Sequence, residues 1–460
     1  MLDQSFSAEN FRKIFDYENR KGNYLAGSFF PDANEKSRKI KRCNDELKEL
    51  KKPSDEDKVD AYTQKKQELV EKKTNLEQEK EQILEDAFKK VSDTATQKNF
   101  SLDLEDRDIN GKKVYVAANS SGDYSGLAKE KRLNLAAQFF ALKQTQKNIS
   151  KLYKVKQADR YNIVCQLREA LRGRFPKYII RTDISSFYES IPRVELIKKI
   201  NEDNLLTYNS KKTIKQILYK YGTLPGGSFK GIPRGVGISA YLSELHMREL
   251  DEEMRNAPNV LYYARYVDDI IIIYTNANPS VKSLRAFCRN IIEKGLKRNR
   301  QKTSLIKANG STPHTIDYLG YSFRFGTGDV KVNITKSKVD RYKSKIDLSF
   351  YDYEKKLKYN EKKARRLLIK RIKFLTGNTR LIGNKKNIRV GIYFSNKILT
   401  DHSYLKGMDC YLTHKVSSLQ NERAKNRLSK LSFQKGFVEK TFYKFSKADL
   451  ENIMEAWKYA

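Results

Sequence analysis

Residues 261–274, LYYARYVDDIIIIY, form an apolar run that is interrupted by two adjacent aspartates, Asp268 and Asp269. The flanking residues are β-branched or aromatic, which predicts two buried strands with the aspartates at a tight turn between them. Burying two carboxylates is costly unless a cation or another partner compensates them. Mg²⁺ binds one or two carboxylates together with substrate phosphates. The run therefore predicts a metal-binding hairpin, and an Asp-Asp turn without metal is the alternative for these letters alone.

A third carboxylate stands in a similar setting. Asp183 ends the apolar segment YIIRTD, 178–183, which reads as a buried strand entering a helix. Pairing this strand with the hairpin brings Asp183 and Asp268 to one edge of a sheet. Two metal ions held there can activate a 3′-hydroxyl and stabilise a leaving pyrophosphate. Such a reaction asks little more of a protein than positioning and charge.

The composition indicates a polyanionic partner. The chain has 460 residues and a formal net charge of +36, enough length for two or three packed units or one large body. An excess of this size predicts tight, salt-sensitive binding of nucleic acid.

Nothing in the sequence points to secretion or to a membrane. The N-terminus lacks a basic start followed by an apolar core, and the longest apolar stretches are too short to cross a bilayer. We therefore expect a cytoplasmic protein without a membrane partner. The cysteines are far apart and form no zinc spacing, so we interpret them as reduced packing residues: Cys43, Cys165, Cys288 and Cys410.

Five motifs, in order, resemble the palm of a reverse transcriptase over about 155–325. They are DISSFYESI at 183–191, GIPRGVGISAYLSEL at 231–245, YVDD at 266–269, GLKRNRQKT at 295–303 and YLGYSF, the primer grip, at 318–323. The combination is far more specific than any single motif. It implies an RNA-directed DNA polymerase with an α+β right-hand fold of fingers, palm and thumb.

The same resemblance implies the catalytic residues. Asp183, Asp268, Asp269 and Lys302 would be catalytic, and Asp183, Ile184, Asp268 and Asp269 would hold two Mg²⁺ ions, with Mn²⁺ as a possible substitute. Lys302 matches the lysine that protonates the leaving pyrophosphate in the family. A solvated surface lysine is the alternative at this position.

The implied nucleotide-binding residues lie in the first two motifs. Tyr188 stands where the family places the ring that excludes a ribose 2′-hydroxyl; a core tyrosine is the alternative. Arg234 departs from the glutamine that most members carry, and its charge could hold the triphosphate or the template backbone. Arg181 could bind phosphate or only neutralise Asp183. The full set is Arg181, Tyr188, Gly231, Pro233, Arg234 and Gly235, and the glycines leave room for close backbone approach.

Outside the palm we predict four further segments. Residues 1–33 form an N-terminal segment, 34–92 an antiparallel helical hairpin arm, 93–180 the fingers and 326–460 a basic, largely helical thumb-like region, with the palm at 181–325. The arm would hold RNA or another subunit, and a solvated charged helix pair is the alternative. FSLDL and KVYVA around Asn110-Gly111 predict a β-hairpin.

The C-terminal region is rich in lysine and arginine. A charge run is usually a solvated face, but the high net charge favours contact with phosphates. The expected nucleic-acid-binding residues are Lys362, Lys363, Arg365, Arg366, Lys370 and Arg371.

The Pro-Arg-Gly variant and the long terminal regions narrow the resemblance to bacterial defence-associated reverse transcriptases of the abortive-infection and unknown-group classes. Residues 371–396 resemble the type-three defence systems, in which two reverse transcriptases act with a noncoding RNA; this chain would be the first of the two. The resemblance implies an antiviral role and, as partners, an RNA template or noncoding RNA, a DNA product, dNTPs and a second reverse transcriptase subunit or a homo-oligomer.

Two other functions remain open. The same site could perform untemplated or protein-primed DNA synthesis. Alternatively, the chain could be an RNA-binding scaffold with a vestigial polymerase site. The intact set of Asp183, Asp268 and Asp269 argues against a scaffold, because nothing structural requires three aspartates there.

Overall fold

The computed structural model describes residues 2–457 except 51–58, 110, 111, 119–121, 157, 276–285, 287–289, 291–293 and 382–387. The chain divides into two compact units. Unit 1 comprises Met1–Lys156 and Tyr188–His246, and unit 2 comprises Gln157–Phe187 and Met247–Ala460. This division cuts the chain elsewhere than the five predicted segments, whose boundaries stay predictions.

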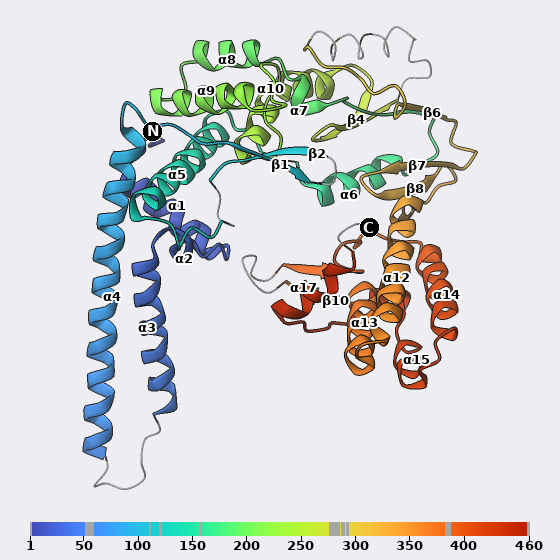
Figure 1. Cartoon of the computed structure of the whole chain (residues 1–460). Coiled ribbons are helices and arrows are strands. Elements are labelled where there is room, and N and C mark those ends of the chain that lie inside the picture. Colours follow the sequence, from blue (N-terminus) through green and yellow to red (C-terminus); the bar gives the residue numbers. More distant parts are fainter. Residues whose placement is uncertain are drawn as a thin grey trace. The chain divides into compact units, whose positions relative to one another are not determined.

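Unit 1 is mainly helical (Figure 1). Its elements are α1 (Ala8–Arg20), α2 (Leu25–Phe29), α3 (Pro31–Glu49), α4 (Val59–Thr96), β1 (Glu105–Ile109), β2 (Lys112–Val116), α5 (Lys129–Leu152), α8 (Arg193–Glu202) and α9 (Tyr208–Thr223). The short helix α7 (Phe187–Ser190) and α10 (Gly237–Asn256) continue across the boundary between the units.

The core of unit 1 is built around phenylalanine rings from four helices or their ends. The ring of Phe140 on α5 lies 5.6 Å from that of Phe11 and 5.4 Å from that of Phe88, between centroids, and the rings of Phe30 and Phe88 are 5.2 Å apart. Edge and offset contacts of this kind add to the burial of large apolar area. Helix α1 is thereby fixed against α4 and α5.

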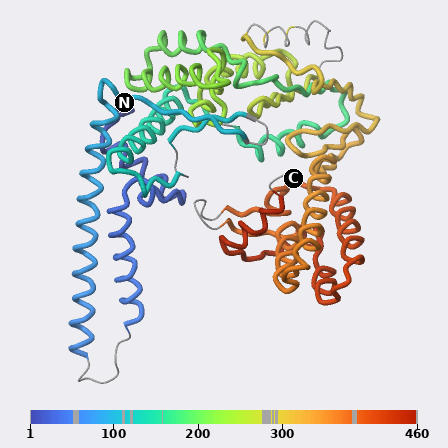
Figure 2. Tube along the Cα trace, viewed as in Figure 1, coloured from blue at the N-terminus to red at the C-terminus, as the bar shows by residue number. Residues whose placement is uncertain are grey.

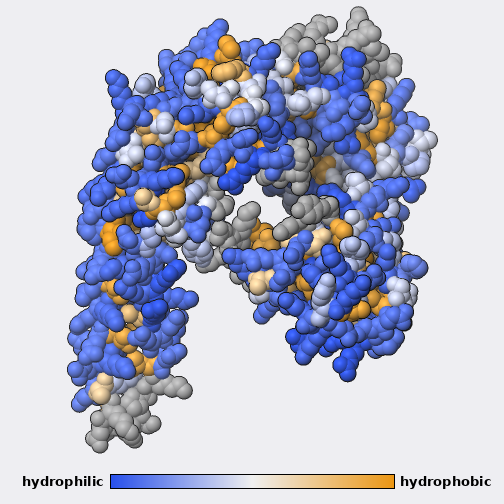
Figure 3. Space-filling view, viewed as in Figure 1, coloured by the Kyte–Doolittle hydropathy of each residue, from blue (hydrophilic) through white to orange (hydrophobic). Residues whose placement is uncertain are grey.

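Helices α3 and α4 lie side by side and antiparallel (Figure 1). The outer half of the pair buries little besides Cys43 and Leu69, and Figure 3 shows its visible surface as largely hydrophilic. The inner half of α4 differs, because Leu84 and Phe88 are only 1% exposed and belong to the core of unit 1. The inner half of the pair is therefore part of the core of unit 1, and the bounds 34–92 of the arm stay a prediction. The sequence also predicts that the second helix of the pair begins after Pro53, a position that lies outside the described residues.

The predicted β-hairpin is present, but its first strand begins five residues later than predicted. Residues 105–109, not FSLDL at 100–104, pair antiparallel with β2. Phe100, Leu102 and Leu104 are buried in unit 1 without being part of a strand, and Gln138 accepts the backbone N–H of Asp103. The alternation of apolar residues thus reports burial of one side of an irregular segment. Asn110-Gly111 lies outside the described residues.

Unit 2 contains a four-stranded antiparallel sheet in the order β4-β5-β3-β6. The strands are β3 (Lys177–Asp183), β4 (Val260–Tyr266), β5 (Asp269–Tyr274) and β6 (Ser304–Ala308), and α6 (Arg160–Leu171) precedes them. Ile270 to Ile273 of the central strand β5 are all fully buried. Burial on both faces explains why this strand is a continuous apolar run. The sequence also favours a helix at roughly 279–298, a range that falls largely outside the described residues.

Lys177 fixes α6 to the start of β3. It is 1% exposed, and its ammonium donates to the carbonyls of Ala170, Leu171, Arg172 and Gly173 at the end of the helix. A cation at a helix C-terminus satisfies carbonyls that have no partner within the helix. Burial lowers the pKa of this ammonium. The contact sets where the strand carrying Asp183 begins.

A second sheet and a helical bundle complete unit 2 (Figure 2). The sheet has the order β7-β8-β9, with β7 (His314–Tyr318), β8 (Tyr321–Phe325) and β9 (Lys331–Ile334). The remaining elements are α12 (Lys336–Leu357), α13 (Glu361–Thr376), β10 (Asn378–Arg380), β11 (Arg389–Gly391), α14 (Ser403–Ser417), α15 (Glu422–Leu428), α16 (Phe433–Val438) and α17 (Lys447–Glu455). Strands β10 and β11 pair with each other as a small separate sheet. One continuous apolar core joins the four-stranded and three-stranded sheets to this bundle.

Two smaller expectations can be compared with the structure. Cys43 is buried, Cys165 is half-buried and Cys410 is exposed, so the interpretation as a packing residue is wrong for Cys410; Cys288 lies outside the described residues. No helix in the described part of the chain is both long enough and apolar enough to cross a membrane.

Candidate active site

Three aspartates meet at one edge of the first sheet of unit 2. In the pairing of β3 with β5, Asp183 lies opposite Asp269, and residues directly opposite each other share one face of a sheet. Asp268 lies in the preceding turn, where Val267 has a left-handed φ of 59°. The backbone N–H of Ile184 donates to the carbonyl of Asp268 over 3.1 Å. We call Asp183, Asp268 and Asp269 the carboxylate turn.

The charges of the carboxylate turn are only partly compensated. Asp183 is 4% exposed; its Oδ2 accepts from the ammonium of Lys302 at 2.7 Å, and its buried Oδ1 has no partner among the described residues. Arg181 Nη2 lies 4.0 Å from Asp269 Oδ1. Burial, together with the negative charges of Asp268 and Asp183, raises the pKa of Asp269. The hydrogen bond to Asp183 raises the pKa of Lys302.

The donor chemistry suits a divalent cation. A buried carboxylate oxygen without a partner is costly, and a hard cation would satisfy it. In the described part of the chain, however, no three His, Cys, Asp or Glu side chains are gathered closely enough to enclose a metal ion. Lys302 pairs with Asp183, and Arg181 lies beside Asp269, so these two cations compensate part of the negative charge. Ile184 is buried and could contribute only a backbone oxygen.

The fourth motif is attached to the end of β3. Ser185 N–H donates to the carbonyl of Lys297, and Asn299 N–H donates to the carbonyl of Asp183, both at 2.8 Å. The hydroxyl groups of Thr182 and Thr303 are also 2.8 Å apart. These contacts hold the loop that carries Lys302 beside the carboxylate turn.

Sequence reasoning missed the residue that supports the turn. The guanidinium of Arg265 donates to both carboxylate oxygens of Asp251 on α10, at 2.9 and 2.7 Å, and through Nη1 to the carbonyl of Val267 at 2.9 Å. Tyr263 donates its hydroxyl to the same carboxylate at 2.8 Å. The side chains of Arg265 and Asp251 are 3% and 9% exposed. An arginine inside an apolar strand needs such a partner, which was the available signal.

The fifth motif contacts the third. The hydroxyl of Tyr318, at the end of β7, donates to the carbonyl of Asp269 over 3.1 Å, and this tyrosine is fully buried. Leu319 and Gly320, with φ of 48° and 76°, form the turn between β7 and β8. The predicted primer-grip hairpin and the carboxylate turn are thus connected within unit 2.

The glycines of the second motif have an internal role in unit 1. Gly231 and Gly235 have φ of 74° and 97°. A Cβ at Gly231 would lie 2.4 Å from the carbonyl oxygen of Glu189, and one at Gly235 would lie 2.2 Å from Val114 Cγ1. Both positions exclude larger residues because the chain itself approaches there. Pro233 between them is buried.

Tyr188 and Arg234 are neighbours in unit 1. The carbonyl of Tyr188 accepts from Ile232 N–H at 2.8 Å, and the Arg234 guanidinium lies 5.9 Å from the centroid of the Tyr188 ring. Arg234 pairs through two nitrogens with Glu189, at 3.1 and 3.3 Å. The arginine is therefore already partly neutralised, and a role in holding phosphate stays a prediction.

The six C-terminal basic residues are not equivalent. Lys362, Lys363 and Arg366 are exposed, whereas Arg365 pairs with Glu361 and Lys370 with Asp449. Arg371 is 1% exposed. Its guanidinium donates to Asp352 and to the backbone carbonyls of Asn452 and Ile453. The expectation that Arg371 contacts phosphates is wrong, because its buried guanidinium links α13 to α12 and α17.

Comparison with known proteins identifies the domain. Residues 121–323 match the family described as "Reverse transcriptase (RNA-dependent DNA polymerase)". They form a reverse transcriptase domain, and the enzyme class that it indicates is RNA-directed DNA polymerase, a nucleotidyltransferase, as predicted. No curated protein matches the chain.

Two solved telomerase structures illustrate the likeness in structure. One is apo telomerase from Candida tropicalis without its C-terminal domain, at 15% identity and a TM-score of 0.37, covering 51% of this chain and 55% of that one. The other is telomerase from Candida albicans with a fragment of telomeric RNA, at 15% identity and a TM-score of 0.34, covering 71% of this chain and 59% of that one. The chain spans less than two thirds of either relative, and at these scores the likeness carries no conclusion about its partners.

Proposed function

We propose that this protein copies RNA into DNA at the carboxylate turn by metal-assisted nucleotidyl transfer. The observation that carries the proposal is the placement of Asp183 opposite Asp269, with a buried Asp183 oxygen that lacks a protein partner. Such an arrangement is costly for the fold alone and suits the binding of a divalent cation. The match of residues 121–323 supplies the reaction class.

The residues of unit 2 have distinct parts in this reaction. Asp183, Asp268 and Asp269 would hold two Mg²⁺ ions, which supply activation of the primer 3′-hydroxyl and charge stabilisation of the leaving pyrophosphate. Lys302 carries a proton on Nζ and lies 2.7 Å from Asp183, so it is placed to donate that proton to the leaving group. Arg181 keeps a positive charge beside Asp269.

The test is an isosteric double variant, Asp268→Asn/Asp269→Asn. We expect primer extension on an RNA template to fall by about a hundredfold or more, because two metal-ligand charges are lost while side-chain volume is kept. The matched control is Asp329→Asn/Asp340→Asn, which removes two charges from exposed positions of the same unit. Extension by the active-site variant at the rate of the control would show that the reaction occurs elsewhere.

We further propose that the enzyme acts in bacterial antiviral defence with a noncoding RNA and a second reverse transcriptase subunit. Support comes from the Pro-Arg-Gly variant at 233–235 and the stretch 371–396, together with the net charge of +36. Phage plating on cells that produce the parent or the Asp268→Asn/Asp269→Asn variant tests the role. Sequencing the co-purified RNA and the DNA product distinguishes templated from untemplated or protein-primed synthesis. Equal plating on both strains would contradict defence by polymerisation.

A further inference from the structure

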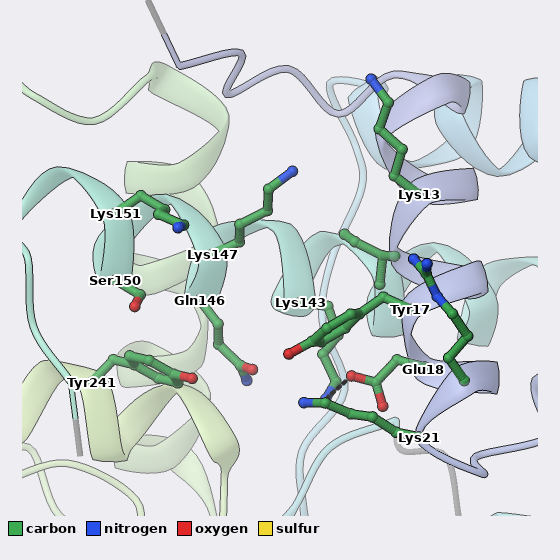
Figure 4. Close-up of a pocket in the computed structure, with 12 residues that line it drawn as sticks. Lys13, Tyr17, Glu18, Lys21, Lys143, Gln146, Lys147, Ser150, Lys151 and Tyr241 are labelled. Atoms are coloured by element: carbon green, nitrogen blue, oxygen red, sulfur yellow. Dashed lines mark hydrogen bonds and ion pairs between the residues drawn. The ribbon is translucent and has the colours of Figure 1, made fainter. Parts of the chain in front are cut away.

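A basic pocket lies within unit 1, between α1, α5 and α10 (Figure 4). It encloses about 490 Å³ and is lined by six cationic side chains and one carboxylate, Glu18. The cations are Lys13 and Arg20 of α1, Lys21 at its end, and Lys143, Lys147 and Lys151 of α5. We call this the α1–α5 pocket. Its residues are independent of the carboxylate turn, which belongs to unit 2.

The single carboxylate does not neutralise the pocket. Glu18 is 5% exposed; one of its oxygens accepts from Lys143 at 3.1 Å and the other from the side-chain amide of Asn23 at 2.6 Å. Lys13 pairs with Glu9. The other four cations, Arg20, Lys21, Lys147 and Lys151, have no ion pair among the described residues. Positive charges held together in a concave site attract an anion.

The three lysines of α5 form a row. They recur at four-residue steps, so they share one helix face at a spacing of about 6 Å along the axis. Like charges at this spacing destabilise an isolated helix, whereas a strand of phosphates relieves the repulsion. A row of this length is suited to successive phosphates better than to a single anion.

The pocket also offers aromatic surface. Figure 4 shows Tyr17 and Tyr241 pointing into it from opposite sides, with Gln146 between them. Tyr17 is 51% exposed, and the ammonium of Lys21 lies 4.1 Å from the centroid of its ring. An exposed ring beside unpaired cations is the combination by which proteins hold a single strand: stacking on a base and charge on the backbone. The volume is sufficient for one nucleotide.

We propose that the α1–α5 pocket binds single-stranded nucleic acid, with Lys147 and Lys151 on successive phosphates and a base stacked on Tyr17. The site would hold a strand outside the reacting centre. Basic patches are common on solvated helices, but this one is concave, has four cations without an ion pair among the described residues, and carries an exposed ring.

The first test neutralises the row. We expect Lys147→Gln/Lys151→Gln to weaken binding of a labelled 12-nucleotide single strand, RNA or DNA, by about tenfold in fluorescence anisotropy. The slope of log affinity against log salt should fall by about 1.4, since each phosphate contact on a single strand contributes about 0.7. The control, Lys129→Gln/Lys131→Gln, removes two exposed charges from the same helix. Equal behaviour of the two pairs would overturn the proposal.

The second test concerns the ring. Tyr17→Leu should weaken binding by about tenfold, whereas Tyr17→Phe should bind as the parent does, because stacking needs the ring and not the hydroxyl. A 4-thiouridine-containing oligonucleotide should cross-link to peptides of α1 or α5. Competition by a mononucleotide as effective as that by the 12-mer, or cross-links confined to other helices, would overturn the proposal. Running both tests in the Asp268→Asn/Asp269→Asn background separates binding from synthesis, because loss of polymerisation there leaves the predicted binding intact.

Discussion

The carboxylate turn of unit 2 and the α1–α5 pocket of unit 1 collect charge in opposite ways. The turn places three acidic groups on the ends of buried strands, where Lys302 and Arg181 compensate them in part. The pocket places cations on exposed helix faces and leaves four of them without an ion pair among the described residues. The backbone of the two strands fixes the geometry of the turn. The pocket, by contrast, offers positive charge on several side chains, which suits a flexible strand.

The difference shows what each kind of site requires. Chemistry on a single phosphodiester bond needs ligands positioned by the backbone, and hydrogen bonds from Arg265, Tyr318 and Ile184 reach the backbone of the turn. Holding a strand needs only charge and stacking surface within reach. We therefore expect single substitutions that affect the support of the turn to have large effects and substitutions in helical surfaces to have graded ones.

The largest effect is expected at Arg265. Replacing it by methionine, Arg265→Met, leaves Asp251 buried without its cation, and loss of one partner of a buried pair costs about 3–5 kcal/mol. The double variant Arg265→Met/Asp251→Leu should recover most of the stability in thermal unfolding. It should not recover primer extension, because the carbonyl of Val267 still lacks its donor. Recovery of both quantities would reduce Arg265 to a purely structural residue.

A smaller effect, confined to substrate choice, is expected in unit 1. Tyr188→Ala should raise incorporation of ribonucleotides relative to deoxynucleotides by about 10- to 100-fold, because the ring that would exclude a 2′-hydroxyl is removed. Tyr188→Phe keeps the ring and should discriminate as the parent does. The measurement is the ratio of kcat/KM for the two sugars. Unchanged ratios in Tyr188→Ala would mean that this tyrosine is a packing residue.

The raised pKa of Asp269 predicts a pH dependence of smaller size. The folded-state pKa of Asp269 lies above its ordinary value of 3.8, so in the metal-free protein this carboxyl binds a proton that the unfolded chain releases. The contribution of Asp269 to stability should therefore increase as pH falls from the folded-state pKa toward the ordinary value. Mg²⁺ needs the ionised carboxylate. The Mg²⁺ concentration for half-maximal extension should therefore increase severalfold as pH is lowered there.

Two measurements check this dependence: the unfolding temperature with and without Mg²⁺, and the Mg²⁺ activation curve. The matched variants are Asp269→Asn, which should lose the part of the pH dependence of the metal-free unfolding temperature that Asp269 contributes, and Asp340→Asn, which should keep it. If the parent protein and Asp269→Asn showed the same change of metal-free unfolding temperature with pH, the assignment would be contradicted.

The turn could be predicted from sequence because the residues that form it are consecutive in the chain. YVDD, its apolar flanks and the strand ending at Asp183 specify the strands and the turn locally, since apolar runs and β-branching reflect burial directly. The same locality identified the strands β3, β4 and β5. What surrounds the turn could not be obtained in this way. Asp251 lies fourteen residues before Arg265, and only the fold shows that the two side chains meet.

The charged regions were the hardest to predict, because a lysine or arginine has the same letter whether it is solvated, paired or buried. Arg371 stands among solvent-facing basic residues of α13, but its own helix face is inside the bundle. The α1–α5 pocket combines residues from 13 to 241, so the sequence showed only the net charge. The prediction of a strand at FSLDL was wrong for a related reason. Alternation of apolar residues indicates that one side of a segment is buried, but not that the segment pairs with another strand.

The smallest effect on primer extension is expected from deleting the outer arm. This deletion tests whether the arm binds a nucleic-acid strand or is a solvated helix pair. Its helices are held by pairs such as Lys36 with Glu79, and the inner half of α4 must be kept because Leu84 and Phe88 belong to the core. Deleting 41–75 and joining the ends with a short Gly-Ser linker should leave basal primer extension within about twofold. Binding of the co-purifying RNA or of a partner protein should weaken, as judged by pull-down and by the salt at which RNA is released.

The control combines the deletion of 41–75 with Lys147→Gln/Lys151→Gln. If the arm and the pocket hold the same strand, the losses of binding from the two changes should not be additive, whereas independent sites give additive losses. An arm deletion that changes neither RNA retention nor partner capture would mark the arm as a solvated helix pair and leave the pocket as the binding surface of unit 1.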